Sequence, residues 1–488
     1  MASTALIDLS TIPLCALYDL LRPITPPISS PTPRFTNWGR TFTCSPIAVF
    51  EPESEYHCQL ILELARREGN VVRAVGVGHS PSDLACTSGY MLRTTKLNRI
   101  LQVHVDKRYV VAQAGITLDT LHVELAKHNL AMINVGSISD QTLGGIVTTA
   151  THGTGINYGV ISTHVMALSL LLADGSRVSC SRQERSDLFI ASICGLGSTG
   201  LILTITLEVE PAFRLREVQE TIEFHQCVRN MHALVDASEH VRFWWFPAAD
   251  TMRVSSADRT VEPRRPVGSW LWHSFFGFHV IQFFLFLGRY LRSLNVFISR
   301  FAAWLVKDKI VAVDDSYRIF NLECRYPQHT TEWAIPYENT QACLQDLHSW
   351  LAQEFADPNG LRPHFPIEVR FSDRDDIWLS PSNSQRTCWI GIVQYKPYGL
   401  EVPYKKLFER FEAIVSAHGG RPHWAKAHHL RPDTLRTLYP RFDDFVHVLQ
   451  DVDPRGMFRN EYVQRHIFGK TGPGFHGRVF KRYVSSEQ

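Results

Sequence analysis

The sequence predicts an α+β protein of at least two domains, and three observations carry this prediction. The chain has 488 residues, which is more than a single hydrophobic core usually holds. Short β-rich runs alternate with amphipathic helical runs as far as about residue 213. Beyond that point the composition changes, because residues 266–288 contain no Asp, Glu, Lys or Arg and are crowded with aromatic residues.

The first unit begins with a helix over residues 51–69, where apolar residues share one face and a Gly-Asn pair ends the pattern. Thr117 can cap a second helix, whose leucines recur at helical spacing. The turn Ala173-Asp-Gly175 lies between two apolar runs and predicts a β-hairpin. The other elements predicted here are strands at 71–75, 109–114 and 201–209 and a short helix at 186–193.

The second unit opens with the uncharged run. Residues 266–288 are long enough to cross a membrane, but His273, His279 and Gln282 lower their hydropathy. A second apolar run, 294–306, contains one charged residue. Three interpretations stay open: a buried helical pair, an interfacial anchor and a full crossing. Further elements predicted are strands at 331–335, 367–371 and 388–394 and helices at 340–354 and 402–418.

Composition and charge exclude several classes of protein. A net charge of +2 is too small for a protein held on nucleic acid by phosphate neutralisation, so no nucleic-acid partner is expected. The ten cysteines are dispersed without a CxxC pair, which favours a reducing compartment and no zinc ribbon. Residues 1–36 are rich in Pro, Ser and Thr. Their apolar run is broken by Pro13 and lacks a basic leader, so no signal peptide is predicted.

The most specific motif is the turn Arg73-Ala-Val-Gly-Val-Gly-His-Ser-Pro-Ser-Asp83. Its glycines allow a turn of bare N–H groups that can seat phosphate oxygens. The turn is not a nicotinamide-type fingerprint, because Pro81 stands where the third glycine should be. A plain phosphate loop has no need of His79 at its rim, whereas a loop that holds a flavin has a use for it. The plainer alternative is a capping histidine.

Two further segments have the composition of a cofactor cradle. Glycines and hydroxyl side chains dominate residues 136–155, and such a wall lets a flat ring and a pyrophosphate approach the backbone. A tight turn before a buried strand is the alternative. Residues 194–202 repeat the glycine pattern, but by themselves they are equally typical of an ordinary turn.

Charged residues that suit catalysis lie further along the chain. Glu368 and Arg370 are two apart, so on a strand they face the same side; a surface ion pair is the alternative. Lys426 follows His423 in the loop 419–429, where a cation can stabilise an anionic reduced flavin; a solvated basic loop is the alternative. The histidines of this loop lack a fourth ligand at zinc spacing, so no metal site is expected.

Together these motifs resemble the sugar-lactone oxidases, which include fungal D-arabinono-1,4-lactone oxidase and animal L-gulonolactone oxidase. These are flavoproteins of the vanillyl-alcohol-oxidase type, and the likeness runs from about Asn37 to Phe468. The resemblance implies a two-domain, FAD-linked oxidase fold of α+β class. Its implied parts are a variable N-terminus at 1–36, an FAD-binding domain at 37–213, a cap domain at 214–450 with a membrane-associating insertion at 266–306, and a segment at 451–488 that returns to the FAD domain.

The resemblance also implies residue roles. His79 would carry FAD covalently, and Glu368 and Arg370 would position the substrate. One of these two, or His423, would take the proton of the C2 hydroxyl, and Lys426 would stabilise the reduced flavin. The other implied FAD contacts are Gly76, Val77, Gly78, Ser80, Ser82, Gly136, Ser137, Thr142, Gly145, Thr148 and His152.

The implied reaction is oxidation of an aldono-1,4-lactone at C2, with D-arabinono-1,4-lactone as the first choice and D-erythroascorbate as product. This is the last step of an ascorbate-type biosynthesis. Gly136 implies reduction of O2 to H2O2, because in this family a small residue at that position goes with oxygen use. Alternatives are an L-gulono- or L-galactono-lactone oxidase, a polyol oxidase, a dehydrogenase with a protein electron acceptor, and an inactive scaffold. The expected location is an intracellular membrane, mitochondrial rather than endoplasmic reticulum.

Overall fold

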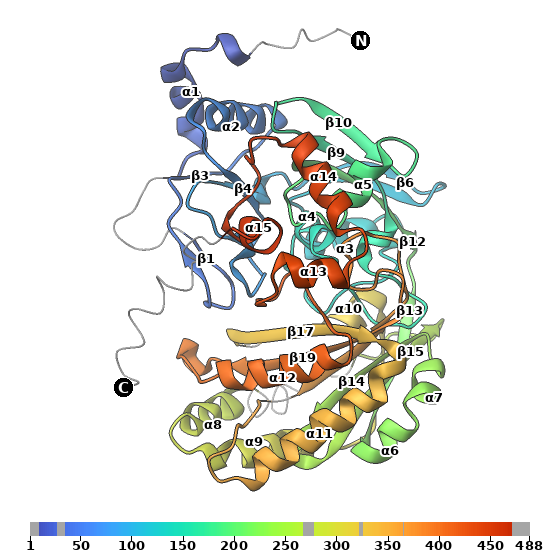
Figure 1. Cartoon of the computed structure of the whole chain (residues 1–488). Helices are drawn as coiled ribbons and strands as arrows, with labels where there is room; N and C mark the ends of the chain where they lie inside the picture. The colour runs from blue at the N-terminus through green and yellow to red at the C-terminus, as the bar shows by residue number, and fades with distance from the viewer. Residues whose placement is uncertain (1–8, 27–34, 267–277, 322–325, 365, 471–488) are drawn as a thin grey trace.

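The computed structural model describes residues 9–26, 35–266, 278–321, 326–364 and 366–470. Figure 1 shows two parts, an N-terminal unit above and a cap unit built on one large sheet below. The N-terminal unit contains a parallel sheet of order β3-β5-β4 and an antiparallel sheet of order β10-β9-β11-β7-β6. The bounds of these strands are β3 Ala48–Phe50, β4 Val72–Val75, β5 Tyr90–Arg93, β6 Ile100–His104, β7 Tyr109–Gln113, β9 Val165–Leu171, β10 Arg177–Ser181 and β11 Leu201–Glu208.

Three helices of this unit were predicted, and the first of them, α2, begins at Glu55, four residues after the predicted start at residue 51. Ser54 accepts a hydrogen bond from the backbone of His57 and caps α2, and Gly69 ends that helix with φ +67°. Thr117 caps α3 in the same way. The predicted strands and the hairpin are also confirmed. The helix bounds are α1 Leu14–Leu21, α2 Glu55–Glu68, α3 Leu118–Ala126, α4 Leu143–Thr148 and α5 Ser186–Ser192.

The cap unit is built on an eight-stranded antiparallel sheet of order β16-β13-β15-β14-β18-β19-β17-β20. The strands expected at 331–335, 367–371 and 388–394 are β17, β18 and β19, while the strands between residues 214 and 315 were not predicted. The bounds are β13 Arg214–Glu223, β14 His240–Phe246, β15 Thr251–Thr260, β16 Ile310–Asp315, β17 Gln328–Pro336, β18 Ile367–Ser372, β19 Thr387–Tyr395 and β20 Arg421–Pro422.

The two faces of this sheet have different surroundings. The face that we call outer is apolar, with buried side chains such as Trp333, Val369 and Ile390, and helices cover it. The face that we call inner carries alternate residues, among them Glu332 and Arg370, and it is turned toward the N-terminal unit. The covering helices are α6 Phe224–Arg229, α7 Met231–Asp236, α11 Thr340–Ala356 and α12 Lys405–Ala417.

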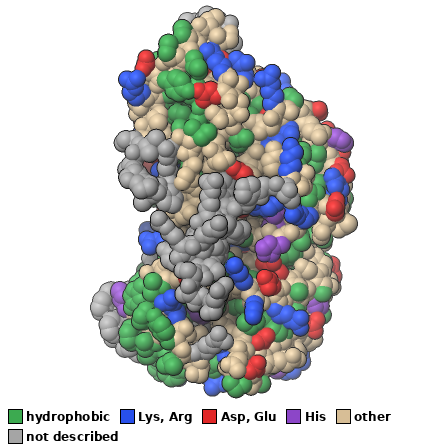
Figure 2. Space-filling view, turned by 60° about the vertical axis from the view of Figure 1, so that its left-hand side comes forward, with side chains coloured by type: hydrophobic (Ala, Val, Ile, Leu, Met, Phe, Trp, Pro, Cys, Tyr) green, Lys and Arg blue, Asp and Glu red, His purple; other side chains and the backbone are tan. Residues whose placement is uncertain are grey.

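The insertion forms two packed helices, α8 (Ile281–Gly288) and α9 (Arg292–Leu305). One side of the pair is buried with Phe246, whereas the other exposes large apolar side chains, which gather at the lower left of Figure 2. The exposed residues are Phe283, Tyr290, Leu291, Phe297 and Trp304. Among the described residues, no helix has the length and hydropathy of a membrane span. Much of the predicted aromatic run, residues 267–277, lies outside the described residues.

The end of the described chain returns to the N-terminal unit. Leu435, Phe445 and Tyr462 join the hydrophobic core of that unit, and Figure 1 shows their helices among its strands. The helices that contribute to this core run from Pro432 to His466, and the boundary at residue 451 stays a prediction. The bounds are α13 Pro432–Leu438, α14 Phe442–Val452 and α15 Glu461–His466.

Candidate active site

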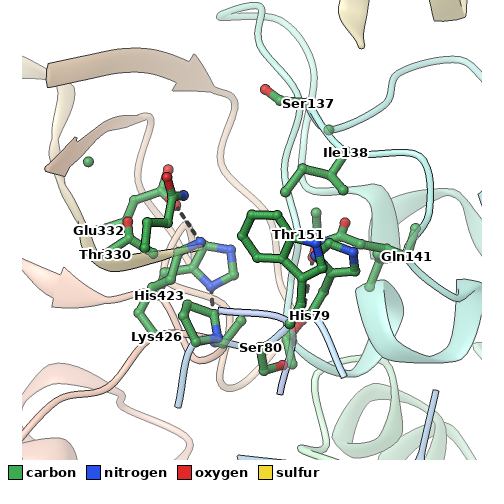
Figure 3. A pocket seen from close by; sticks show the side chains of 18 of the residues that line it. His79, Ser80, Ser137, Ile138, Gln141, Thr151, Thr330, Glu332, His423 and Lys426 are labelled. Carbon is green, nitrogen blue, oxygen red and sulfur yellow. Dashed lines mark hydrogen bonds and ion pairs between the residues drawn. The ribbon is translucent and has the colours of Figure 1, made fainter. Parts of the chain in front are cut away.

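A cavity of about 1590 Å³ lies between the N-terminal unit and the inner face of the cap sheet. Figure 3 shows His79, Gln141 and Thr151 on one side of it and Glu332, His423 and Lys426 on the other. The predicted site residues that line it are Gly76, Val77, Gly78, His79, Ser80, Gly136, Ser137, Thr142, Gly145, Thr148, His152, Glu368, Arg370, His423 and Lys426. The volume exceeds what one small substrate fills, which fits a cavity for a large cofactor and a substrate.

The N-terminal wall of the cavity is bare backbone at several points. A Cβ at Gly76 would lie 2.0 Å from the hydroxyl of Thr142, and Gly78 has φ +76°, so neither position tolerates a side chain. A Cβ at Gly145 would lie 3.2 Å from the same hydroxyl. This wall therefore lets a flat ring and a pyrophosphate lie against N–H groups, as an FAD site requires.

Ser82 differs from the other predicted cofactor contacts. Its hydroxyl donates to the carbonyl of Ala425 at 2.9 Å and accepts from the N–H of Leu84, where it caps a short helix. The side chain is fully buried and does not line the cavity. Ser82 thus links the two walls of the site with its hydroxyl, and a contact of Ser82 with the cofactor stays a prediction.

His79 is held by two neighbours that the sequence analysis missed. Its ring stacks on Trp38 at 5.2 Å between centroids, and its Nε2 lies 3.0 Å from the carboxylate of Asp140. Burial lowers the pKa of His79, and this outweighs the opposing effect of Asp140. A neutral imidazole that donates from Nε2 leaves Nδ1 unprotonated. This Nδ1 is buried without a hydrogen-bond partner among the described residues, so it is available to a bound flavin.

Glu332, also missed by the sequence analysis, is the centre of the opposite wall. Its carboxylate contacts Arg370 at 3.0 Å, His152 at 3.1 Å and Lys426 at 3.5 Å. Burial alone would raise the pKa of Glu332, but Arg370, Lys426 and His152 hold it well below its usual range. Glu332 therefore stays ionised and fixes two cations in the cavity. The sequence did contain a signal for Glu332, which is the single acid in the mostly apolar run 331–335. A buried charge needs partners, so an acid in such a run indicates an ion pair.

The loop after β20 positions His423 and Lys426. The N–H of His423 donates to the backbone carbonyl of Glu332 at 3.0 Å, which ties the loop to β17. The Nδ1 of His423 accepts from the N–H of Ala425 at 3.1 Å. Burial lowers the pKa of His423 well below its usual range, so the ring is neutral and its proton is on Nε2. His423 is thus a hydrogen-bond donor and not a base in this arrangement.

Glu368 and Arg370 both line the cavity, as their spacing on a strand predicts. The Nε of Arg370 lies 3.6 Å from one oxygen of Glu368, and its NH1 donates to the hydroxyl of Ser137 at 3.3 Å. Arg370 thereby joins the cap unit to the N-terminal unit. The other oxygen of Glu368 is buried and has no hydrogen-bond partner among the described residues. Glu368 therefore has an acceptor to offer a ligand.

His152, Glu332 and His423 place one ligand atom each within 4.8 Å of one another, which is a donor set typical of a metal site. Two cations already contact this carboxylate, however, and they oppose a third positive charge. His152 also stacks on Trp389 with 3.8 Å between ring centroids, which holds it parallel to the indole. The cluster is therefore better described as an ion-pair network.

Comparisons with known proteins agree with this geometry. A family model described as D-arabinono-1,4-lactone oxidase matches residues 205–466, and one described as FAD binding domain matches residues 46–181. The first covers the cap sheet with Glu332, Arg370 and Lys426, and the second covers the loop with His79.

Individual relatives extend over most of the chain. The L-gulonolactone oxidase of Scyliorhinus torazame is 40% identical over 89% of this chain and 98% of its own length. The D-arabinono-1,4-lactone oxidase of Yarrowia lipolytica is 31% identical over 81% of this chain and 86% of its own length. Among solved structures, cholesterol oxidase from B. sterolicum superposes with a TM-score of 0.75 at 17% identity, covering 91% and 99% of the two chains, which shows the shared fold.

Proposed function

The chain belongs to the D-arabinono-1,4-lactone oxidase family, and on that premise we propose that it prefers D-arabinono-1,4-lactone and passes the electrons to O2. Family membership makes it an FAD-dependent oxidoreductase that oxidises an aldonolactone. The observation that supports flavin-dependent lactone oxidation is the pair of facing walls, with bare glycine backbone and His79 on one side and Glu368, Arg370 and Lys426 on the other. The choice of D-arabinono-1,4-lactone is supported by the family model that matches residues 205–466. A second candidate substrate, L-gulono-1,4-lactone, is favoured by the relative at 40% identity.

Bound FAD supplies a hydride acceptor for C2 of the lactone. The protein's own residues supply binding, orientation and charge. Arg370 is fixed on both sides, by Glu332 and by Ser137, so it can hold the lactone carbonyl without reorganising. Lys426 lies against Glu332 and provides a fixed positive charge next to the cofactor site.

Glu368 is the residue that we propose to accept the proton of the C2 hydroxyl. Glu332 is a poor base, because its cationic neighbours hold its pKa low. His423 already accepts a hydrogen bond at Nδ1 and carries its proton at Nε2. Glu368 retains an oxygen with no partner among the described residues. Glu368→Gln should slow anaerobic flavin reduction while lactone binding persists. An unchanged rate of flavin reduction would mean that another group accepts the proton of the C2 hydroxyl.

We also propose that FAD is attached covalently to His79. The support is the unpartnered, unprotonated Nδ1, which is the nucleophilic atom of the ring, together with the bare backbone of Gly76 and Gly78 beside it. Acid precipitation of the holoenzyme should leave the yellow colour with the polypeptide, and His79→Ala should release it to the supernatant. Colour released from the unmodified protein would refute the linkage.

Gly136 supports the choice of O2. It lines the cavity, and a Cβ there would lie 3.3 Å from the methyl group of Thr151, which is close but accommodated by a small shift. Gly136→Ala should therefore fold, load FAD and reduce it with lactone at the normal rate. Its reoxidation by O2 should slow by about tenfold or more. Equal reoxidation rates in both proteins would contradict this role.

The direct test of function is a panel of lactones. Purified holoenzyme is mixed anaerobically with D-arabinono- or L-gulono-1,4-lactone, and flavin bleaching is followed before air is admitted and H2O2 is measured. We expect bleaching by lactones, the highest kcat/KM with D-arabinono-1,4-lactone, and one H2O2 for each lactone oxidised. Bleaching without peroxide would indicate a dehydrogenase. A higher kcat/KM with L-gulono-1,4-lactone would make that lactone, and not D-arabinono-1,4-lactone, the preferred substrate.

We further propose that the exposed side of α8 and α9 rests on an intracellular membrane surface. Phe283, Phe297 and Trp304 are each about half exposed there, and aromatic side chains suit the boundary between headgroups and acyl chains. Replacing these three by Ser should abolish flotation with phospholipid vesicles. Ser at the similarly exposed Leu101 and Val123 of the N-terminal unit is the control. Equal flotation of both variants would refute the proposal that the exposed side of α8 and α9 contacts the membrane.

A further inference from the structure

Gly391 lies inside β19, and the fold gives no reason for a glycine there. Its φ is outside the left-handed region, so other residues can adopt this backbone. The three atoms nearest to a Cβ at this position would all belong to the side chain of Glu332, the closest at an ordinary contact distance of 3.5 Å. A glycine within a strand is destabilising relative to alanine. The cavity, which Gly391 lines, is the remaining reason for its presence.

The register of the sheet places Gly391 between two carboxylates. Glu332 is paired with Gly391 across β17 and β19, and Gly391 is paired with Glu368 across β19 and β18. Paired residues have Cβ atoms about 4.5–5.5 Å apart on the same face of a sheet. The missing side chain therefore leaves a gap on the inner face, with an acidic residue on each side. One of these, Glu368, has an oxygen without a partner among the described residues.

The gap leads away from the reacting end of the site. Arg370 lies two residues beyond Glu368 and contacts Ser137 of the N-terminal wall, so it marks the cofactor side. In the opposite direction along the strands, the next pair on the same face is Thr330 and Val393, and both line the cavity. One step of two residues along a strand is about 6.6 Å, which is the length of a short polyol chain.

We propose that the gap over Gly391 receives the side chain at C4 of the lactone, and that Gly391 sets the longest side chain that the enzyme accepts. In a five-membered lactone, C4 and its substituent lie across the ring from C2. With C2 and its hydroxyl between Arg370 and Glu368, the substituent points over Gly391 toward Thr330 and Val393, which also line the cavity. Six-carbon lactones are then substrates as well as five-carbon ones. The inference rests on the proposed lactone oxidation.

Two lactones isolate this effect. L-Galactono-1,4-lactone and D-arabinono-1,4-lactone have the same configuration at C2, C3 and C4, and the former has one more CHOH in its side chain. The ratio of their kcat/KM values is measured in the holoenzyme and in Gly391→Ala and Gly391→Val. We expect Gly391→Val to lower the ratio, galactono over arabinono, by about tenfold or more, and Gly391→Ala to lower it less.

Val393→Ala is the reciprocal variant, because it widens the next pair along the gap, and it should raise the same ratio. Gly391→Ala should also raise the Tm of the holoenzyme, since a Cβ fits the strand. An equal loss of both substrates in the Gly391 variants, or a Gly391→Ala protein that does not fold, would overturn the inference. Failure of the proposed function is distinct, because then neither lactone would bleach the flavin of the unmodified enzyme.

Discussion

The outer and inner faces of the cap sheet are both buried, but by different means. On the outer face, Val369 and Phe371 of β18 pack against apolar side chains of the same hydrophobic core. On the inner face of the same strand, Glu368 and Arg370 lie in the cavity. One strand thus contributes alternately to stability and to chemistry. A single substitution on it should affect one property much more than the other.

Two glutamates on either side of β17 show how the surroundings decide charge. Glu332 on the inner face is buried among cations, and its pKa is well below the usual range. On the outer face, Glu412 of α12 accepts a hydrogen bond from the hydroxyl of Thr331 at 2.9 Å. Burial raises the pKa of Glu412 to about 7, and hydrogen bonds from Thr331 and Trp333 offset this only in part. Burial disfavours the ionised form of both carboxylates. On the inner face, Arg370, Lys426 and His152 outweigh this effect at Glu332.

The largest effect that tests this contrast should come from Glu332→Gln. The change leaves Arg370 and Lys426 without their common anion, and breaking a buried ion pair costs about 3–5 kcal/mol. Displaced cations should lower kcat/KM with lactone by roughly 100-fold or more. Steady-state kinetics and the Tm report the two consequences. Glu332→Asp, which keeps the charge, is the control and should recover part of the activity; no recovery would argue against an electrostatic role.

Phe371→Ala tests the outer face next to Arg370 on the same strand. Phe371 is fully buried, and its truncation should reduce the free energy of unfolding by about 3–5 kcal/mol. Denaturant unfolding measures this loss. In protein that remains folded, the rate of flavin reduction by lactone should stay within about twofold, since the side chain points away from the cavity. A large drop in that rate would show that the two faces are not separable.

Glu412→Gln should give the smallest effect, and one that depends on pH. The folded-state pKa of Glu412 is raised from 4.5 to about 7, so folding favours its protonated form. Its contribution to stability is therefore present at low pH and declines as the pH rises from about 4.5 to 7. Glutamine should stabilise the protein by about 1–2 kcal/mol at a pH of about 8 and by little at a pH near 4.5. Thermal melts at both pH values check this, and a uniform shift would contradict it.

The contrast between the faces also explains what could be predicted from the sequence. Local signals were sufficient for the end of α2 and the start of α3, because Gly69 and Thr117 determine these helix ends through their own backbone and side-chain bonds. The glycines around His79 were recognisable for the same reason. Local motifs therefore located the cofactor wall of the cavity.

The inner face of the sheet was less accessible to sequence reasoning. The strand β14 is buried on both sides and shows no alternation. The polar residues of β13 and β15, such as Glu217 and Arg253, contact other residues of the cap unit. Glu332 and Asp140 acquire their roles from partners far away in the chain. No local pattern distinguishes such residues from exposed acids, because their partners are set by the packing of the two units.

The segment that returns to the N-terminal unit bears on how the enzyme is made. Asn460 donates to the carbonyls of Leu84 and Cys86, and Arg465 pairs with Asp83 at 2.7 Å, so this segment holds the turn that follows His79. A ribosome releases these late residues only after the whole cap has been synthesised. The histidine loop thus gains its last supports at the end of synthesis, and we expect cofactor loading to follow translation. A chain shortened before Asn460 should accumulate as a colourless protein even where its cap is folded.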